Sequence, residues 1–215
     1  MADLSIREIL DQVSRGQIRI PAFQRGFVWE SERVAYLMDS MYKKYPFGSL
    51  LFWRTREVLR FDRKLGPFDL PDPKVDYPVD YVLDGQQRVT SIYCVFQNDM
   101  VMPENNFWLP IYFDLLAEAT AQDSQFVALE PSKADPNRYF PLNALFDTVA
   151  YRKATAILSA EVVKSIDRMQ EVFKETRVSA QSTETTDKAT VAIIFERINR
   201  QGVELDTLQL LSAWT

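Results

Sequence analysis

The chain has 215 residues, of which 47% are hydrophobic, and a formal net charge of −5. The length suits one large or two small domains, and the acidic balance argues against a general nucleic-acid coat protein, because such proteins neutralise phosphates with Lys and Arg. The sequence has no histidine, which excludes Ser-His-Asp and Cys-His catalysis and histidine-bound metals from this chain. One cysteine, no signal peptide and no apolar run of about 20 residues predict a cytoplasmic protein without a membrane segment.

The N-terminal residues predict an alternation of helices and strands. Residues 5–14 are expected to form a helix that opens with a capping box of Ser5 and Glu8, and a short strand follows at residues 18–20. A second helix is expected with Ser31 as its N-cap, and Pro46 and Gly48 are expected to end it.

The middle of the chain is expected to be rich in strands. Residues 49–61 predict two strands, and residues 79–83 predict a third, which leads into the segment DGQQR and a helix. Residues 108–115 and 125–129 predict two more strands.

Strand patterns fade beyond about residue 143. A long helix is expected at residues 152–175, a mobile polar connection at residues 176–188 and a helix at residues 189–199. A further helix is expected to open at Asp206, and the chain is interpreted as the front part of a longer protein. The pattern predicts an α+β protein, with an α/β domain at residues 1–150 followed by a helical region at residues 151–215.

The segment DGQQR is a polar island between two apolar segments. A junction of strand and helix exposes unpaired N–H groups and a partial positive charge, which favour phosphate binding. Gly85 permits a tight turn, Gln86 and Gln87 offer amide groups, and Arg88 offers a planar fork that matches phosphate oxygens. Asp84 can hold a divalent cation or orient a water. These parts suit a nucleotide; the alternative interpretation is that Asp84 merely caps the helix.

Two further segments join arginine and amide side chains to a glycine. FQRGFVW places Gln24 and Arg25 at the end of a strand, and FERINRQGVEL places Arg197 and Asn199 at the end of a helix. Each has a structural interpretation, the first as a turn anchored by its aromatic residues and the second as a helix C-terminus. Three such islands in one chain are harder to explain as three separate turns. Because FQR and DGQQR both follow strand-like segments, we expect adjacent strands to bring them to one pocket, where Arg25 and Arg88 bind the same ligand.

The segments IPAFQRGFVW, LDGQQRVTSIY and FERINRQGVEL, in this order, resemble the N-terminal domain of GmrSD-type, modification-dependent restriction enzymes and related phage-defence proteins. The resemblance covers essentially the whole chain and implies a mixed-sheet fold similar to the ParB/sulfiredoxin-like nucleases. It also implies nucleotide binding and hydrolysis at DGQQR, and coupling to a C-terminal nuclease domain or partner subunit that acts on DNA. Because this chain lacks histidine, a histidine-containing nuclease is expected either beyond residue 215 or not at all.

The motif match places the expected site residues. Catalytic roles are expected for Asp84, Gln87 and Arg88, with Asp84 as the ligand of the Mg²⁺ that accompanies a nucleoside triphosphate. Nucleotide-binding roles are expected for Gln24, Arg25, Gly85, Gln86, Arg197 and Asn199. The favoured function is therefore a nucleotide-binding and hydrolysing sensor domain of a restriction protein that acts on modified DNA.

Two other functions stay open at this point. One is a DNA-binding module that recognises modified DNA without turnover of a nucleoside triphosphate, and the other is a ParB-like metal-dependent nuclease. Sulfiredoxin-like enzymes use a reactive cysteine, but Cys94 lies inside an apolar helix pattern and is expected to be a buried, inert thiol.

Overall fold

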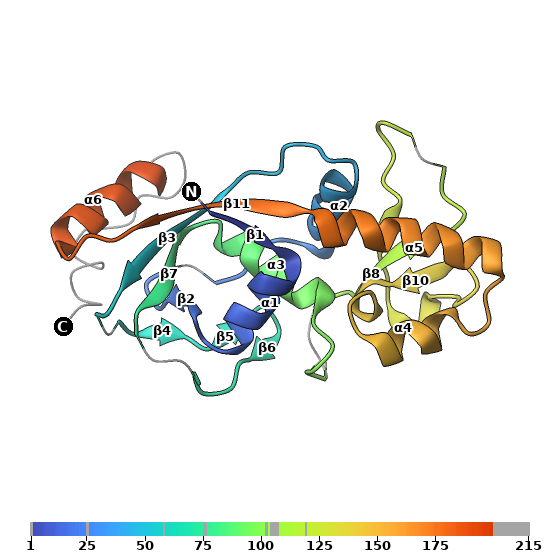
Figure 1. Cartoon of the computed structure of the whole chain (residues 1–215), viewed down its shortest axis with the longest axis horizontal. Helices are drawn as coiled ribbons and strands as arrows, with labels where there is room; N and C mark the ends of the chain where they lie inside the picture. The colour runs from blue at the N-terminus through green and yellow to red at the C-terminus, as the bar shows by residue number, and fades with distance from the viewer. Residues whose placement is uncertain are drawn as a thin grey trace.

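A computed structural model describes residues 2–24, 26–57, 59–74, 77–101, 103, 108–118 and 120–199. Its centre is a mixed six-stranded sheet with the strand order β1-β11-β3-β7-β2-β4 (Figure 1). Helices accompany this sheet, so the predicted α+β class is confirmed. No helix among these residues is long and apolar enough to cross a membrane.

The central sheet is built from strands that lie far apart in the sequence. Its members are β1 (Ala2–Ser5), β2 (Ile18–Pro21), β3 (Leu50–Thr55), β4 (Phe61–Asp62), β7 (Val79–Asp84) and β11 (Arg177–Thr183). Smaller sheets are formed by β5 (Lys64–Leu65) with β6 (Phe68–Asp69), and by β8 (Ile111–Asp114), β9 (Phe126–Ala128) and β10 (Tyr139–Pro141). The helices are α1 (Ile6–Ser14), α2 (Ser31–Tyr42), α3 (Gln86–Phe96), α4 (Thr148–Thr155), α5 (Ala160–Glu175) and α6 (Lys188–Asn199).

The central sheet is covered on both faces, and β7 shows this most clearly. Its side chains alternate, so that Val82 packs in the cluster that contains α1 and α3, whereas Tyr81 and Leu83 pack in a second cluster with α6. Because both faces of β7 are covered, its first five residues are buried, and the buried carboxylate of Asp80 is paired with Arg54.

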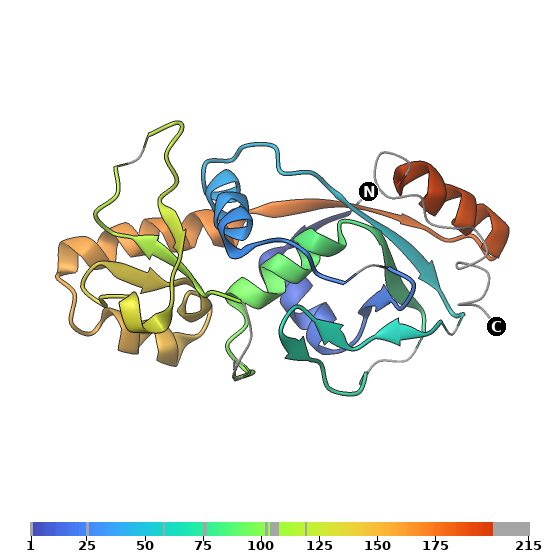
Figure 2. The same ribbon diagram turned by 180° about the vertical axis from the view of Figure 1, so that it is seen from behind.

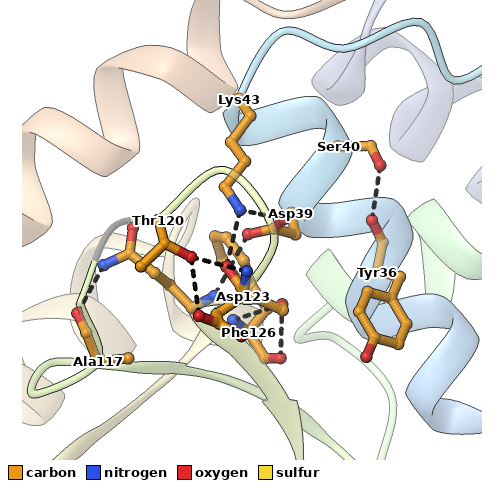
Figure 3. A network of polar contacts seen from close by, with 10 residues as sticks. Tyr36, Asp39, Ser40, Lys43, Ala117, Thr120, Asp123 and Phe126 are labelled. Atoms are coloured by element: carbon orange, nitrogen blue, oxygen red, sulfur yellow. Dashed lines mark hydrogen bonds and ion pairs between the residues drawn. The ribbon is translucent and has the colours of Figure 1, made fainter.

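The three-stranded sheet lies at the opposite end of the molecule from α6, and α5 runs beside it before the chain enters β11 (Figures 1 and 2). A polar cluster joins this part to α2 (Figure 3). Lys43 Nζ lies 2.7 Å from Asp39 Oδ2 and donates a hydrogen bond of 2.8 Å to the carbonyl of Asp123. The Lys43 and Asp39 side chains are only 12% and 9% exposed, so this ion pair is largely shielded from solvent and acts as a structural tie.

The prediction of a mobile connection at residues 176–188 is wrong. Residues 177–183 form β11, which pairs antiparallel with β1 and parallel with β3. Val178 and Ala180 are buried between exposed neighbours, and the Ser, Gln and Thr residues on the other side hid this alternation in the sequence. The division into residues 1–150 and 151–215 stays a prediction, although the central sheet takes strands from both parts.

Two helix predictions also need correction. Ser31 is the first residue of α2 rather than its N-cap, because its hydroxyl accepts a hydrogen bond from the Leu109 N–H at 3.0 Å. The single helix predicted at residues 152–175 is two helices, α4 and α5. The hydroxyl of Ser159 accepts from the Val162 N–H and starts α5 anew.

Candidate functional site: the junction of β7 and α3

The sheet topology brings two of the predicted polar segments to one edge. β7 and β2 are adjacent and parallel, so the carboxyl ends that lead into DGQQR and FQRGFVW lie side by side. The predicted adjacency of these two strands is confirmed. β3 runs antiparallel to β7 with Leu51 opposite Asp84, so the start of β3 lies at the same edge.

Gly85 makes the sharp turn from β7 into α3. It is the N-cap residue and has a φ of 91°, a left-handed conformation that favours glycine. A Cβ atom at this position would lie 2.5 Å from Leu50 Cδ2 and 3.1 Å from the carbonyl oxygen of Ser49. Both the backbone conformation and the close approach of β3 therefore require glycine at the junction.

The N-terminus of α3 is open. Gly85 supplies no side chain to cap the helix, and the first turn contains no acidic residue. The side chain of Gln86 is half-buried and makes no hydrogen bond to any other residue that the structure describes. The first N–H groups of α3 and the Gln86 amide are thus available to an anion.

Arg88 points toward the start of β3. Its Nε and Nη2 donate to the Ser49 carbonyl at 3.3 and 2.8 Å, and Nη2 lies 3.2 Å from Asp84 Oδ2. The Asp84 side chain is 39% exposed and the Arg88 side chain 20%. Asp84 is therefore the more accessible member of this ion pair.

Gln87 and Gln24 fix the segment FQRGFVW against the junction. The Gln87 side chain accepts from the Val28 N–H at 3.0 Å and donates to the Gly26 carbonyl at 3.2 Å, as a neighbouring strand would do. Gln24 Nε2 donates to the Val82 carbonyl of β7. The structure thus brings the predicted residues Gln24 and Gln87 to one place, with their amide groups bound to backbone.

Aromatic side chains hold the same segment from two sides. The Phe23 ring meets the Phe195 ring edge-on, with centroids 5.1 Å apart, and the Phe27 ring lies 5.7 Å from that of Trp108. Phe195 belongs to α6, which carries the start of the third predicted segment, FERIN. All three segments therefore have residues at this edge of the sheet.

The structure does not place every predicted site residue. Arg25 and the side chain of Asn199 lie outside the described residues. Arg197 is exposed in the last turn of α6. A shared grip of Arg25 and Arg88 on one ligand stays a prediction.

Gly48 and Ser49 also belong to this site, and sequence reasoning missed them. The residues around Gly48 were interpreted only as the end of α2, which in fact ends at Tyr42. A glycine just before a predicted strand was the available signal, whereas its φ of 91° and its contact with Arg88 are visible only in the structure.

The predicted metal ligand, Asp84, and the predicted inert thiol, Cys94, lie in different environments. No group of three or more Asp, Glu, Cys or His side chains gathers anywhere in the part of the chain that the structure describes. One accessible carboxylate, Asp84, fits Mg²⁺ that is bound mainly by water and by substrate phosphates. Cys94 is buried, as predicted, and this desolvation raises the pKa of its thiol well above the ordinary range.

Fold and site together define an α+β domain with an uncapped helix N-terminus at the edge of a mixed sheet. The family of GmrSD restriction endonuclease N-terminal domains matches residues 6–215, and the chain belongs to this family. An uncharacterized protein of Methanocaldococcus jannaschii is 26% identical over 243 aligned positions, which cover 96% of this chain and 41% of that protein. The chain thus spans about two fifths of the length of this curated relative.

Proposed function

We propose that this chain is the nucleotide-binding and hydrolysing sensor domain of a cytoplasmic restriction protein that acts on DNA in phage defence. The family supports the link to restriction. The observation that carries the nucleotide assignment is the uncapped N-terminus of α3, where the Gln86 amide has no bonding partner among the described residues and Asp84 is accessible. An effector nuclease, in a further domain or a partner subunit, completes the proposal.

The residues divide the work on a nucleoside triphosphate. The first N–H groups of α3 bind a phosphate oxygen, and Gln86 donates a second hydrogen bond from its side chain. Asp84 would hold Mg²⁺, which when bound would neutralise negative charge on the phosphates. The Gln87 side chain keeps the FQRGFVW segment in place by bonding to the backbone of that segment. Arg197 contributes a positive charge from the last turn of α6.

The direct test is a calorimetric titration with each of the four nucleoside triphosphates, with and without Mg²⁺, together with an assay of phosphate release. We expect binding that Mg²⁺ strengthens, and hydrolysis that Asp84→Asn abolishes. Asp11→Asn is the matched control, because Asp11 forms an exposed ion pair with Arg15 on α1.

Two results would contradict the proposal. One is the absence of nucleotide binding by the folded wild-type protein. The other is salt-dependent affinity for modified DNA that no nucleotide changes, which would favour a DNA-binding module instead.

A further inference from the structure

We infer that Arg88 is a positioning residue that holds Asp84 and the Gly48–Ser49 turn, rather than a ligand of phosphate. The inference rests on the proposed function only for the role of Asp84 as a metal ligand. It replaces the expected phosphate-binding role of Arg88 and adds Gly48 and Ser49 to the residues that shape the site.

One edge of the Arg88 guanidinium, formed by Nε and Nη2, is already occupied. The edge formed by Nε and Nη2 donates twice to the Ser49 carbonyl, and the same Nη2 reaches Asp84 Oδ2. To bind a phosphate with this edge, Arg88 would have to leave the Ser49 carbonyl without its donor and Asp84 without its counter-ion. With a side chain only 20% exposed, it offers little further surface to a ligand.

Gly48 makes room for this arrangement. A Cβ atom at Gly48 would lie 3.0 Å from both Cζ and Nη2 of Arg88 and 3.2 Å from Nε. The guanidinium therefore lies against the Gly48 backbone. Gly48 has a φ of 91°, the left-handed conformation of a turn, and Ser49 follows it directly. A methyl group at position 48 would force the Arg88 guanidinium to shift by a few tenths of an ångström from the position in which it bonds to Ser49 and Asp84.

The strand ladder explains why Asp84 needs this support. The register of β3 and β7 shifts between Leu51 and Phe52, so Leu51 faces Asp84 whereas Phe52 faces Val82. Such an irregularity weakens backbone pairing at the end of β7. Arg88 spans it, because it bonds to Ser49 just before β3 and to Asp84 at the end of β7.

The first test needs no nucleotide. Gly48→Ala should lower the melting temperature clearly less in the Arg88→Ala background than in the wild type, because only the cost of the left-handed backbone remains once Arg88 is gone. Gly66→Ala is the control; Gly66 also has a positive φ but faces Cys94, so its effect should be equal in both backgrounds. An equal effect of Gly48→Ala in both backgrounds would show that Gly48 and Arg88 are not energetically coupled, and would contradict the inference.

The second test separates positioning from phosphate binding. Arg88→Ala should change nucleotide affinity without Mg²⁺ by less than about threefold, but raise the Mg²⁺ concentration needed for half-maximal turnover by about tenfold, which corresponds to about 1.4 kcal/mol. Arg88→Lys should restore part of the Mg²⁺ response, because an ammonium can reach one of the two acceptors. In the Asp84→Asn background, Arg88→Ala should have no further effect on the Mg²⁺ dependence of nucleotide binding.

A loss of about tenfold or more in Mg²⁺-free nucleotide affinity, with an unchanged Mg²⁺ requirement, would show that Arg88 binds phosphate and would overturn the inference. If the wild type binds no nucleotide, the proposed function fails. The melting temperatures of the Gly48 and Arg88 variants then decide alone whether Arg88 positions the junction.

Discussion

Helices α1 and α3 both begin directly after a strand, but their first turns are built in opposite ways. At α1, the Ser5 hydroxyl accepts from the Glu8 N–H at 3.2 Å, and the Glu8 carboxylate accepts from the Ser5 N–H at 2.7 Å. At α3, the N-cap is Gly85, which can bond to nothing through a side chain. The first helix start is closed by its own residues, and the second is left open.

The difference lies in where the polar side chains of the first turn are directed. In α3, Gln87 bonds to the FQRGFVW backbone and Arg88 bonds to Ser49, so both stiffen the surroundings rather than cap the helix. The first N–H groups of α3 are thus surrounded by segments that Gln87 and Arg88 hold in place. Such preorganised hydrogen-bond donors favour binding, because they are in position before the ligand arrives. The contrast with α1 can be tested residue by residue.

The largest effect on stability is expected from Gly85→Ala. A left-handed alanine costs about 1–2 kcal/mol, and the contact with Leu50 adds about 1–3 kcal/mol of overpacking. Denaturant unfolding should therefore show a loss of roughly 2–5 kcal/mol. Gly26→Ala is the control, since no atom lies within 4 Å of its Cβ position. A loss below that of the control would contradict the strained junction.

Gln87→Ala is expected to come next. It removes both hydrogen bonds to the FQRGFVW segment, which together contribute about 1–2 kcal/mol to the unfolding free energy. Amide hydrogen exchange at Val28 should also become faster, because this N–H loses its acceptor. Unchanged exchange at Val28 would show that the aromatic anchors, Phe23 and Phe27, hold the segment without Gln87.

A loss of about 1 kcal/mol is expected from Ser5→Ala, the usual contribution of an N-cap. Hydrogen bonds from the Ser5 side chain and backbone lower the pKa of Glu8, with a smaller contribution from Arg177. A carboxyl group whose pKa is lower in the folded state stabilises the fold at pH values above its pKa in the unfolded state. This stabilisation is lost as the pH falls through the pKa of the folded state.

The destabilisation by Ser5→Ala should therefore be greatest near neutral pH and shrink below about pH 4. Unfolding measured at both pH values checks this prediction. A loss of stability that grows on acidification would contradict the assigned role of Glu8. Weaker nucleotide binding by Ser5→Ala would show that the start of α1 also takes part in binding.

The smallest effect on stability belongs to Gln86→Ala. Because Gln86 has no hydrogen-bond partner among the described residues, the unfolding free energy should change by less than about 0.5 kcal/mol. Nucleotide affinity, by contrast, should fall by about tenfold or more, since a hydrogen bond to a charged group contributes about 1.5–3 kcal/mol. Destabilisation without loss of affinity would assign Gln86 to the fold.

Local patterns in the sequence predict the parts that depend on neighbours along the chain. The capping box of Ser5 and Glu8, the strand before DGQQR and the burial of Cys94 all follow from spacing and residue type. The adjacency of β2 and β7 also follows, because each precedes a similar polar segment.

What the sequence does not show depends on pairing between distant segments. The contact of Arg88 with Ser49 exists only because β3 lies beside β7 in one register. Strand β11 was missed because only Val178 and Ala180 face inward, and the polar residues between them are typical of a connection. Such features are fixed by tertiary packing, which overrides local propensity.

The central claim is that α3, and not α1, presents its first turn to a nucleotide. Hydrogen exchange with and without Mg²⁺ and a nucleoside triphosphate, read by mass spectrometry, compares both helix starts in one protein. We expect slower exchange at residues 85–89 and no change at residues 5–9. Bound nucleotide without slower exchange at residues 85–89, or with equal slowing at residues 5–9, would contradict this claim.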